Sequence, residues 1–210
     1  MTQYNAKVSI LPYTTHTQVN PTPFLQKINQ YTNLTTEAED AWVSLLKEKT
    51  YQKGDNFIRI GQVPKKLAFV VKGLFSQYYI NERGDTGIKY FFPEGRIAGS
   101  VPATLTKSES LFTITALEET TVLEYDFSEF KRLVAAYPDI ATFYIRYLEQ
   151  HWVIDKEPYE MSLRSDSARV RYADFLRKYP ELVKRLKKHH IASYLGITPT
   201  QLSRIFGYSK

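Results

Sequence analysis

The chain of 210 residues contains no cysteine. This absence excludes disulfides, thiolate catalysis, cysteine-ligated zinc and iron–sulfur clusters. Only four histidines occur, and a site built from histidines alone is not expected, so we predict no metal. Long hydrophobic runs are missing too. No stretch reaches the roughly 18 apolar residues that a bilayer span needs, and residues 1–20 lack the apolar segment of a secretory signal. We therefore expect a cytoplasmic protein.

Catalytic motifs are also absent. The sequence has no phosphate-cradling glycine loop and no paired-carboxylate motif. His189 and His190 stand beside lysines at the start of a predicted helix, where an imidazole is solvated or faces a phosphate more often than it acts as a base. The sequence therefore predicts that the protein is not an enzyme.

Basic residues are concentrated near the C-terminus. The formal net charge is +6, yet residues 164–210 carry eleven lysines and arginines against three acidic residues, and the rest of the chain carries 17 against 19. A basic segment joined to a near-neutral one is typical of a phosphate-binding module attached to a second unit. A solvated basic face without a partner is the alternative.

The N-terminal two thirds of the chain change pattern twice. Residues 1–22 contain prolines and predict a loose or extended arm, and apolar residues at helical spacing in 24–48 predict short helices. Between residues 51 and 125, β-rich runs alternate with glycine-containing turns, which is typical of an antiparallel sandwich or barrel. The predicted strands are 56–60, 66–71, 74–80, 86–92, 112–117 and 121–125.

Helical spacing returns after Tyr125. It predicts one helix over 127–136 and a longer one that opens at Pro138 and runs to about Leu163. The longer helix is apolar on more than one side, so we expect it to pack against its own chain and against a second copy. Pro158 removes a backbone donor and predicts a kink or break there.

Residues 188–206 have the spacing of a helix-turn-helix. Ile191, Leu195 and Leu202 supply the apolar contacts between two short helices, and Gly196 falls at the turn, where a positive φ is commonly needed. Thr198 is predicted to cap the second helix, with Pro199 in its first position, where a missing amide costs nothing. An ordinary helical hairpin with a glycine turn is the alternative.

The second helix of this motif would present polar side chains to a DNA groove. Arginine and glutamine form paired hydrogen bonds with guanine and adenine edges, while lysines at the start of the first helix suit phosphates. Arg204 is the best candidate base reader. The predicted DNA-binding residues are Lys187, Lys188, His189, Ser193, Thr198, Pro199, Thr200, Gln201, Ser203 and Arg204.

The segment IASYLGITPTQLSRI, residues 191–205, resembles the CRP/FNR family of bacterial regulators. The order of segments from about residue 24 onward and the landmarks FPEG (92–95) and IAG (97–99) agree with that family. The resemblance implies an α+β chain: an N-terminal antiparallel β-roll, jelly-roll-like, with flanking helices, a long central dimerisation helix, and an all-α helix-turn-helix domain. The domain boundaries we predict are an arm at 1–22, a cyclic-nucleotide-binding-like sensor at 23–136, a dimerisation helix at 137–163 and a DNA-binding domain at 164–210.

The resemblance also implies partners: double-stranded DNA, a second copy of the chain through residues 138–163, and RNA polymerase. The wing that usually follows the second helix is abbreviated, because only residues 207–210 remain. Activation and repression are equally compatible with the sequence. A ligand-binding or protein-interaction module that has lost sequence-specific DNA binding is therefore the alternative function.

The sensor departs from the family's cyclic AMP pattern. The family holds the ribose with a glutamate after the cassette glycine, where this chain has Ser100, and the phosphate with an Arg-Ser pair, whereas residues 108–111 contain no arginine. Burying a phosphate without a guanidinium leaves its desolvation poorly offset, and Glu109 would repel it. We therefore assign no cofactor and expect that any small-molecule effector is not cyclic AMP. A vestigial pocket is the alternative. The family's site maps to Gly99, Ser100, Val101, Ser110 and Leu111.

Overall fold

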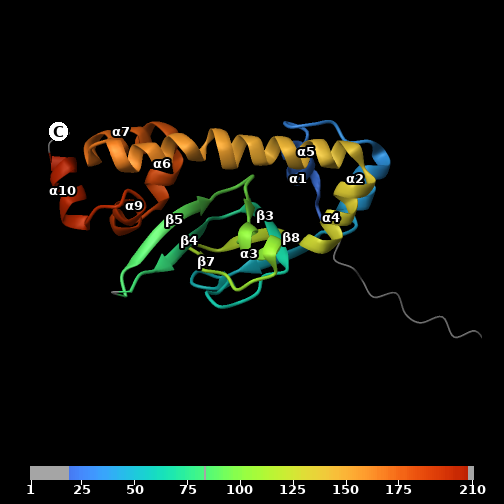
Figure 1. Cartoon of the computed structure of the whole chain (residues 1–210), viewed down its shortest axis with the longest axis horizontal. Helices are drawn as coiled ribbons and strands as arrows, with labels where there is room; N and C mark the ends of the chain where they lie inside the picture. Colours follow the sequence, from blue (N-terminus) through green and yellow to red (C-terminus); the bar gives the residue numbers. More distant parts are fainter. Residues whose placement is uncertain (1–18, 83, 208–210) are drawn as a thin grey trace, which may run out of the picture.

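The computed structural model describes residues 19–82 and 84–207. Most of the predicted arm and the last three residues of the abbreviated wing lie outside these residues, so both remain predictions. Within the described part, a β-roll lies beneath a long helix, with small helices at one end and a helical C-terminal region at the other (Figure 1). The predicted fold class is confirmed.

The β-roll consists of two four-stranded antiparallel sheets, in the orders β1-β8-β3-β6 and β2-β7-β4-β5. Val70, Phe75, Ile114 and Val122 are buried between them. A short helix, α3, follows β6 in sequence. The bounds are β1 Lys47–Tyr51, β2 Asn56–Ile58, β3 Lys66–Lys72, β4 Phe75–Ile80, β5 Thr86–Phe92, β6 Ile97–Ala98, α3 Val101–Thr106, β7 Thr113–Ala116 and β8 Thr120–Asp126.

Strand β1 corrects the sequence prediction, which assigned residues up to 48 to helices. Its first four residues are exposed and only Tyr51 is buried. The strand pairs with β8 at the edge of its sheet. Edge strands are often short and charged, so this one lacks the hydrophobic alternation that reveals a strand in the sequence.

Aromatic side chains join the helices to the roll. Helices α1 (Thr22–Ile28), α2 (Thr36–Val43) and α4 (Phe127–Ala136) pack beside the first turns of the central helix. The ring of Trp42 lies 5.0 Å from those of Phe24 and Phe143 and 4.9 Å from that of Phe130, between ring centroids. Such large buried rings hold the start of the central helix firmly against the roll.

The central helix continues past Pro158, and the irregularity predicted there as a kink or break lies in the preceding turn. Helix α5 (Pro138–Leu148) passes into a π-helical segment, η1 (Glu149–Ile154), and then into α6 (Lys156–Ser165). The amide of Asp155 donates to the carbonyl of Gln150 at 2.9 Å, five residues back. Proline at 158 cannot donate to the carbonyl of Ile154, and the irregularity lies in the turn before the proline.

The C-terminal region contains α7 (Ala168–Lys178), α8 (Pro180–Arg185), α9 (Lys188–Tyr194) and α10 (Pro199–Gly207). Its core of Phe175, Leu182 and Leu202 is continuous with Ile88 and Phe91 of β5. Figure 1 shows α9 beside β5. The basic region is therefore packed against the roll. Over the described residues, no helix is long and apolar enough to cross a membrane, and no group of three metal-ligating side chains occurs.

Candidate functional site

Helices α9 and α10 meet in the geometry that the sequence predicted. Ile191, Ala192, Leu195 and Leu202 are buried between them. Gly196 lies in the turn with a φ of +67°, a conformation that glycine adopts without the strain that a Cβ atom brings. The turn therefore depends on this glycine.

The start of α10 is held by a reciprocal pair of hydrogen bonds. The amide of Gln201 donates to Oγ1 of Thr198 at 3.2 Å, and the amide of Thr198 donates to Oε1 of Gln201 at 2.9 Å. Such a capping box satisfies donors that the first helical turn leaves free. Thr198 is thus the N-cap that we predicted, and the Gln201 side chain serves the cap in this conformation.

The remaining predicted DNA-binding residues divide by exposure. Nearly all are exposed, on α10 and at the start of α9, while Ser193 is only partly exposed. The exposed members are Lys187, Lys188, His189, Thr198, Pro199, Thr200, Gln201, Ser203 and Arg204. Their role in binding DNA remains a prediction.

Ser193 contacts the β-roll. Its hydroxyl donates to the carbonyl of Thr86 at 2.9 Å and accepts from the amide of Ile88, also at 2.9 Å. It thereby extends the edge of β5 as a neighbouring strand would. In this conformation the hydroxyl is engaged within the protein, so a phosphate contact from Ser193 requires α9 to leave β5.

Arg185 ties the same two regions together. Its guanidinium donates to both carboxylate oxygens of Glu94, at 2.9 and 3.0 Å, and also bonds Glu118. The hydrogen bonds to Glu94 raise the pKa of Arg185, although burial of the guanidinium opposes this shift. Burial alone would raise the pKa of Glu94, but its hydrogen bonds, chiefly the one from Arg185, lower it overall. A bidentate pair fixes orientation as well as charge. Ser193 and Arg185 together form what we call the docking contact.

Of the five residues predicted to bind an effector, the structure brings Ser100 and Ser110 into contact, and binding by any of the five remains a prediction. Ser100 and Ser110 are buried and bonded to each other, with 2.9 Å between their hydroxyl oxygens, and Ser110 also donates to the carbonyl of Phe112. Leu111 is 75% exposed. The two hydroxyls that would face a phosphate are therefore bonded to each other, and Gly99 and Val101 line a cavity.

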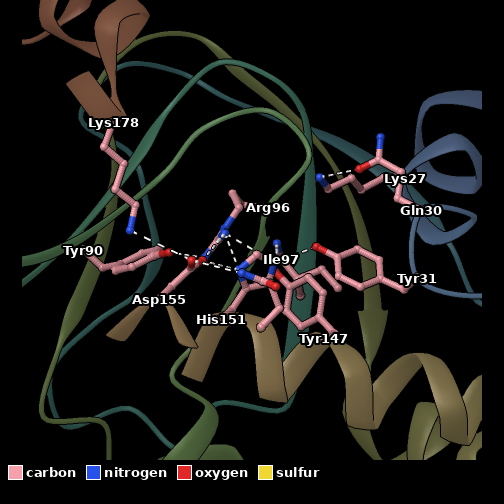
Figure 2. A network of polar contacts seen from close by, with 11 residues as sticks. Lys27, Gln30, Tyr31, Tyr90, Arg96, Ile97, Tyr147, His151, Asp155 and Lys178 are labelled. Carbon is pink, nitrogen blue, oxygen red and sulfur yellow. Dashed lines mark hydrogen bonds and ion pairs between the residues drawn. The ribbon is translucent and has the colours of Figure 1, made fainter. Parts of the chain in front are cut away.

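That cavity has a volume of about 190 Å³ and lies between the roll, the central helix and the C-terminal region. Arg96 lines this cavity, and Figure 2 shows Tyr90, His151 and Asp155 around its guanidinium. Arg96 lies 2.6 Å from Nδ1 of His151 and 3.7 Å from Asp155, and it donates to the hydroxyl of Tyr90. We call these four residues and this space the Arg96 cavity.

His151 is neutral at physiological pH. Burial and the neighbouring Arg96 charge lower its pKa to about 4, although Asp155, 2.8 Å from Nδ1, opposes the shift. Nε2 of His151 lies 2.7 Å from the hydroxyl of Tyr31, whose pKa is raised to about 12, mainly by burial. The imidazole therefore adds hydrogen bonds to the cavity and no charge.

The architecture is similar to that of known proteins. Residues 48–137 match the family described as "Cyclic nucleotide-binding domain". FixK2 from Bradyrhizobium japonicum is 18% identical with a TM-score of 0.66, over 78% of this chain and 83% of its own. The regulator CLP of Xanthomonas campestris is 12% identical with the same TM-score, over 83% of this chain and 91% of its own. The chain has the CRP/FNR fold.

A sequence relative agrees with this assignment. Electron transport regulator A of Shewanella oneidensis is 26% identical over 172 residues, which cover 77% of this chain and 68% of that protein. The resemblance to CRP/FNR regulators is thus confirmed at the level of the fold. Within the CRP/FNR fold, the Arg96 cavity was missed by sequence reasoning because its four defining residues are separated by up to 65 positions in the chain, from Tyr90 to Asp155. The helical i, i+4 spacing of His151 and Asp155 was the one available signal.

Proposed function

We propose that the protein is a DNA-binding transcriptional regulator of the CRP/FNR type, which responds to an effector held next to its β-roll. The observation that supports this most is helix α10, where Leu202 is fully buried while Thr200, Gln201, Ser203 and Arg204 are exposed. A helix anchored by one face and polar on the other suits the major groove. The capping box gives this helix a defined start.

The two helices would divide the work. Arg204 and Gln201 have the side chains that form paired hydrogen bonds with guanine and adenine, whereas Lys187 and Lys188 suit phosphates, which position a protein without reading the sequence. The Gln201 side chain would have to leave the capping box to read a base. Arg204 is therefore our first choice for base recognition.

The protein would act as a homodimer through residues 138–163. Large apolar side chains are exposed along this part of the chain: Ile145 at 54%, Ile154 at 60% and Met161 at 63%. A two-fold pair can place two recognition helices about one turn of DNA apart. The same proposal divides the chain into a sensor, a dimerisation helix and a DNA-binding domain. It also includes a contact with RNA polymerase if the protein activates transcription.

Selection from random duplex DNA, followed by binding titrations at several salt concentrations, tests the proposal. We expect a recovered sequence preference and an affinity that falls steeply with salt. Arg204→Ala should relax the preference at one base step and cost about 1–3 kcal/mol, while Lys188→Ala should weaken all duplexes alike. Arg132→Ala, which removes a charge from α4 at a residue whose side chain is 74% exposed, is the control and should change neither.

The alternative is an interaction module that does not bind DNA specifically. One observation favours it: the docking contact holds α9 against the roll in this conformation. Uniform effects of Arg204→Ala and Lys188→Ala would reject the assigned roles. Failure to recover any preferred sequence, with or without cell extract as a source of effector, would support the alternative.

A further inference from the structure

We infer that the Arg96 cavity binds a small aromatic carboxylate, with Arg96 as its counter-ion. The inference rests on the proposed function, since it names the chemical class of the effector. Of the residues that the family resemblance implied, this cavity includes Gly99 and Val101 but not Ser100, Ser110 or Leu111.

The residues that line the Arg96 cavity carry an excess of positive charge. Asp155 lies 3.7 Å from Arg96 and 4.0 Å from Lys178, so one carboxylate is shared by two cations. Lys89 and Lys156 also line the cavity, against one further carboxylate, Glu160, which pairs with Lys156 at 3.2 Å. With a neutral His151, the lining carries more positive than negative charge. Partly buried cations in excess favour an anion.

The donors around Arg96 suit a carboxylate. The guanidinium side chain is only 17% exposed and is held by Tyr90 and His151. An arginine fixed in this way offers its planar fork at little further cost in entropy, and carboxylates match that fork with two parallel hydrogen bonds.

The wall of the cavity is largely aromatic. Rings from the roll and from the central helix line it, and most of its surface is apolar. Its volume of about 190 Å³ exceeds the roughly 10–15 Å³ that one water needs by an order of magnitude. A cavity of this kind with one charged group suits a ring that carries one charge. The aromatic lining includes Tyr90, Phe92, Tyr125, Phe143, Tyr147 and Tyr159.

One buried tyrosine hydroxyl in the cavity lining is unsatisfied within the described part of the chain. Tyr125 lines the cavity, is 2% exposed, and its hydroxyl has no hydrogen-bond partner among the described residues. A buried hydroxyl without a partner is costly. A hydroxyl or carbonyl on the ligand's ring would satisfy it, so the ligand carries a second polar group on the ring, apart from the carboxylate.

The place of the cavity connects it to DNA binding. Lys178 and Tyr179 on the α7 side and Tyr194 of α9 form part of its wall, and the same Tyr194 ring lies 5.3 Å from that of Phe91 in β5. A ligand that contacts both the roll and the C-terminal region changes the free energy difference between the docked arrangement and an arrangement in which the two are apart. The effector would therefore act on the docking contact.

Calorimetric titration of the full chain with 4-hydroxybenzoate, benzoate and the uncharged 4-hydroxybenzyl alcohol tests this inference. We expect 4-hydroxybenzoate to bind more tightly than the other two. Arg96→Gln should weaken 4-hydroxybenzoate at least tenfold, whereas Arg132→Gln on α4 should leave it unchanged. Trp152 lines the cavity, so its fluorescence should change on binding.

A second variant keeps the test valid if Arg96→Gln destabilises the fold. Tyr125→Phe removes only the unpaired hydroxyl, and it should weaken 4-hydroxybenzoate severalfold while leaving benzoate as it was. The inference would be overturned if the uncharged alcohol bound as tightly as 4-hydroxybenzoate, if Arg96→Gln kept full affinity for 4-hydroxybenzoate, or if neither acid bound at millimolar concentration. Tighter binding of cyclic AMP or inorganic phosphate than of 4-hydroxybenzoate would overturn it too. Because DNA binding is measured separately, a regulator that selects a DNA sequence but ignores these acids would refute this inference alone.

Discussion

At the scale of single residues, His151 makes the protein sensitive to mild acid. Its pKa is lowered to about 4 by burial and by Arg96, and burial together with the adjacent His189 and Lys187 lowers that of His190 to about 4. Between pH 6.5 and 4 the unfolded chain therefore binds protons that the folded chain does not. The free energy of unfolding should fall as the pH falls through this window, by at most about 1.4 kcal/mol per pH unit for each histidine.

Urea titrations between pH 7 and pH 4.5 measure this slope. His151→Gln should reduce the slope by roughly half and leave the contribution of His190. The groups around His151 are Tyr31, Arg96, Asp155 and, further away, Lys27. The pKa of Asp155 is lowered, so its own loss of stabilisation comes at lower pH. An unchanged slope in His151→Gln would contradict the assignment.

Thr198 gives a second prediction at this scale. Thr198→Ala removes the side-chain half of the capping box and should lower the free energy of unfolding by about 1 kcal/mol. Ser203→Ala is the matched control, because it removes a hydroxyl that bonds only the carbonyl of Pro199 within α10. Its effect should stay within about 0.5 kcal/mol. Equal losses in the two variants would show that the cap does not stabilise α10.

The sequence predicted residues that act locally and missed those that act over long range. Gly196, Thr198 and Pro199 were found because a turn and a cap are defined by neighbours three or four positions away. Arg96 had no such pattern: its partners lie in β5 and in the central helix, and only the fold brings them together. Ser193 was assigned to DNA, yet its partners in β5 are 105 and 107 residues away.

At the scale of elements, the pairing of α9 with β5 yields a prediction for hydrogen exchange. The amide of Ile88 donates to Oγ of Ser193. Ser193→Ala should speed exchange of this amide by about fivefold, as expected for the loss of one hydrogen bond worth roughly 1 kcal/mol. Exchange at Ile88 followed by NMR measures the effect, with Ser203→Ala as control. No change at Ile88 would mean that α9 leaves β5 in solution.

The helices and strands were predicted where their periodicity was clear. The strands of the roll alternate with glycine turns, and α4 and α5 begin at Phe127 and Pro138, as their helical spacing predicted. Strand β1 and the π-helical segment were missed for different reasons. The first is an exposed edge without alternation. The second depends on how a turn adapts to Pro158, which spacing alone does not reveal.

At the scale of the whole molecule, the exposed apolar side chains of the central helix predict a dimer. Ile154 and Met161 are seven residues apart, which places them on one face. Met161→Glu should bring a charge into the proposed interface and raise the dimer dissociation constant by about 100-fold or more. Sedimentation at micromolar concentration measures the change, and Leu111→Glu, at a residue 75% exposed on the roll, should have no effect. A wild-type monomer would refute the proposed interface.

The π-helical segment η1 sets the angular relation between the two ends of the molecule. Each residue turns an α-helix by about 100°, so a turn that takes in one extra residue moves all later side chains around the axis by about that angle. Upstream, Phe143 and Tyr147 face the roll, and downstream Tyr159 stacks on Tyr194 of α9 with 4.8 Å between ring centroids. Tightening of this one wide turn into a regular one would rotate Tyr159 away from Tyr194 and turn the C-terminal region relative to the roll, without breaking the helix. A change of one residue in this turn would thus rotate the C-terminal region about the axis of the central helix while the helix stays continuous.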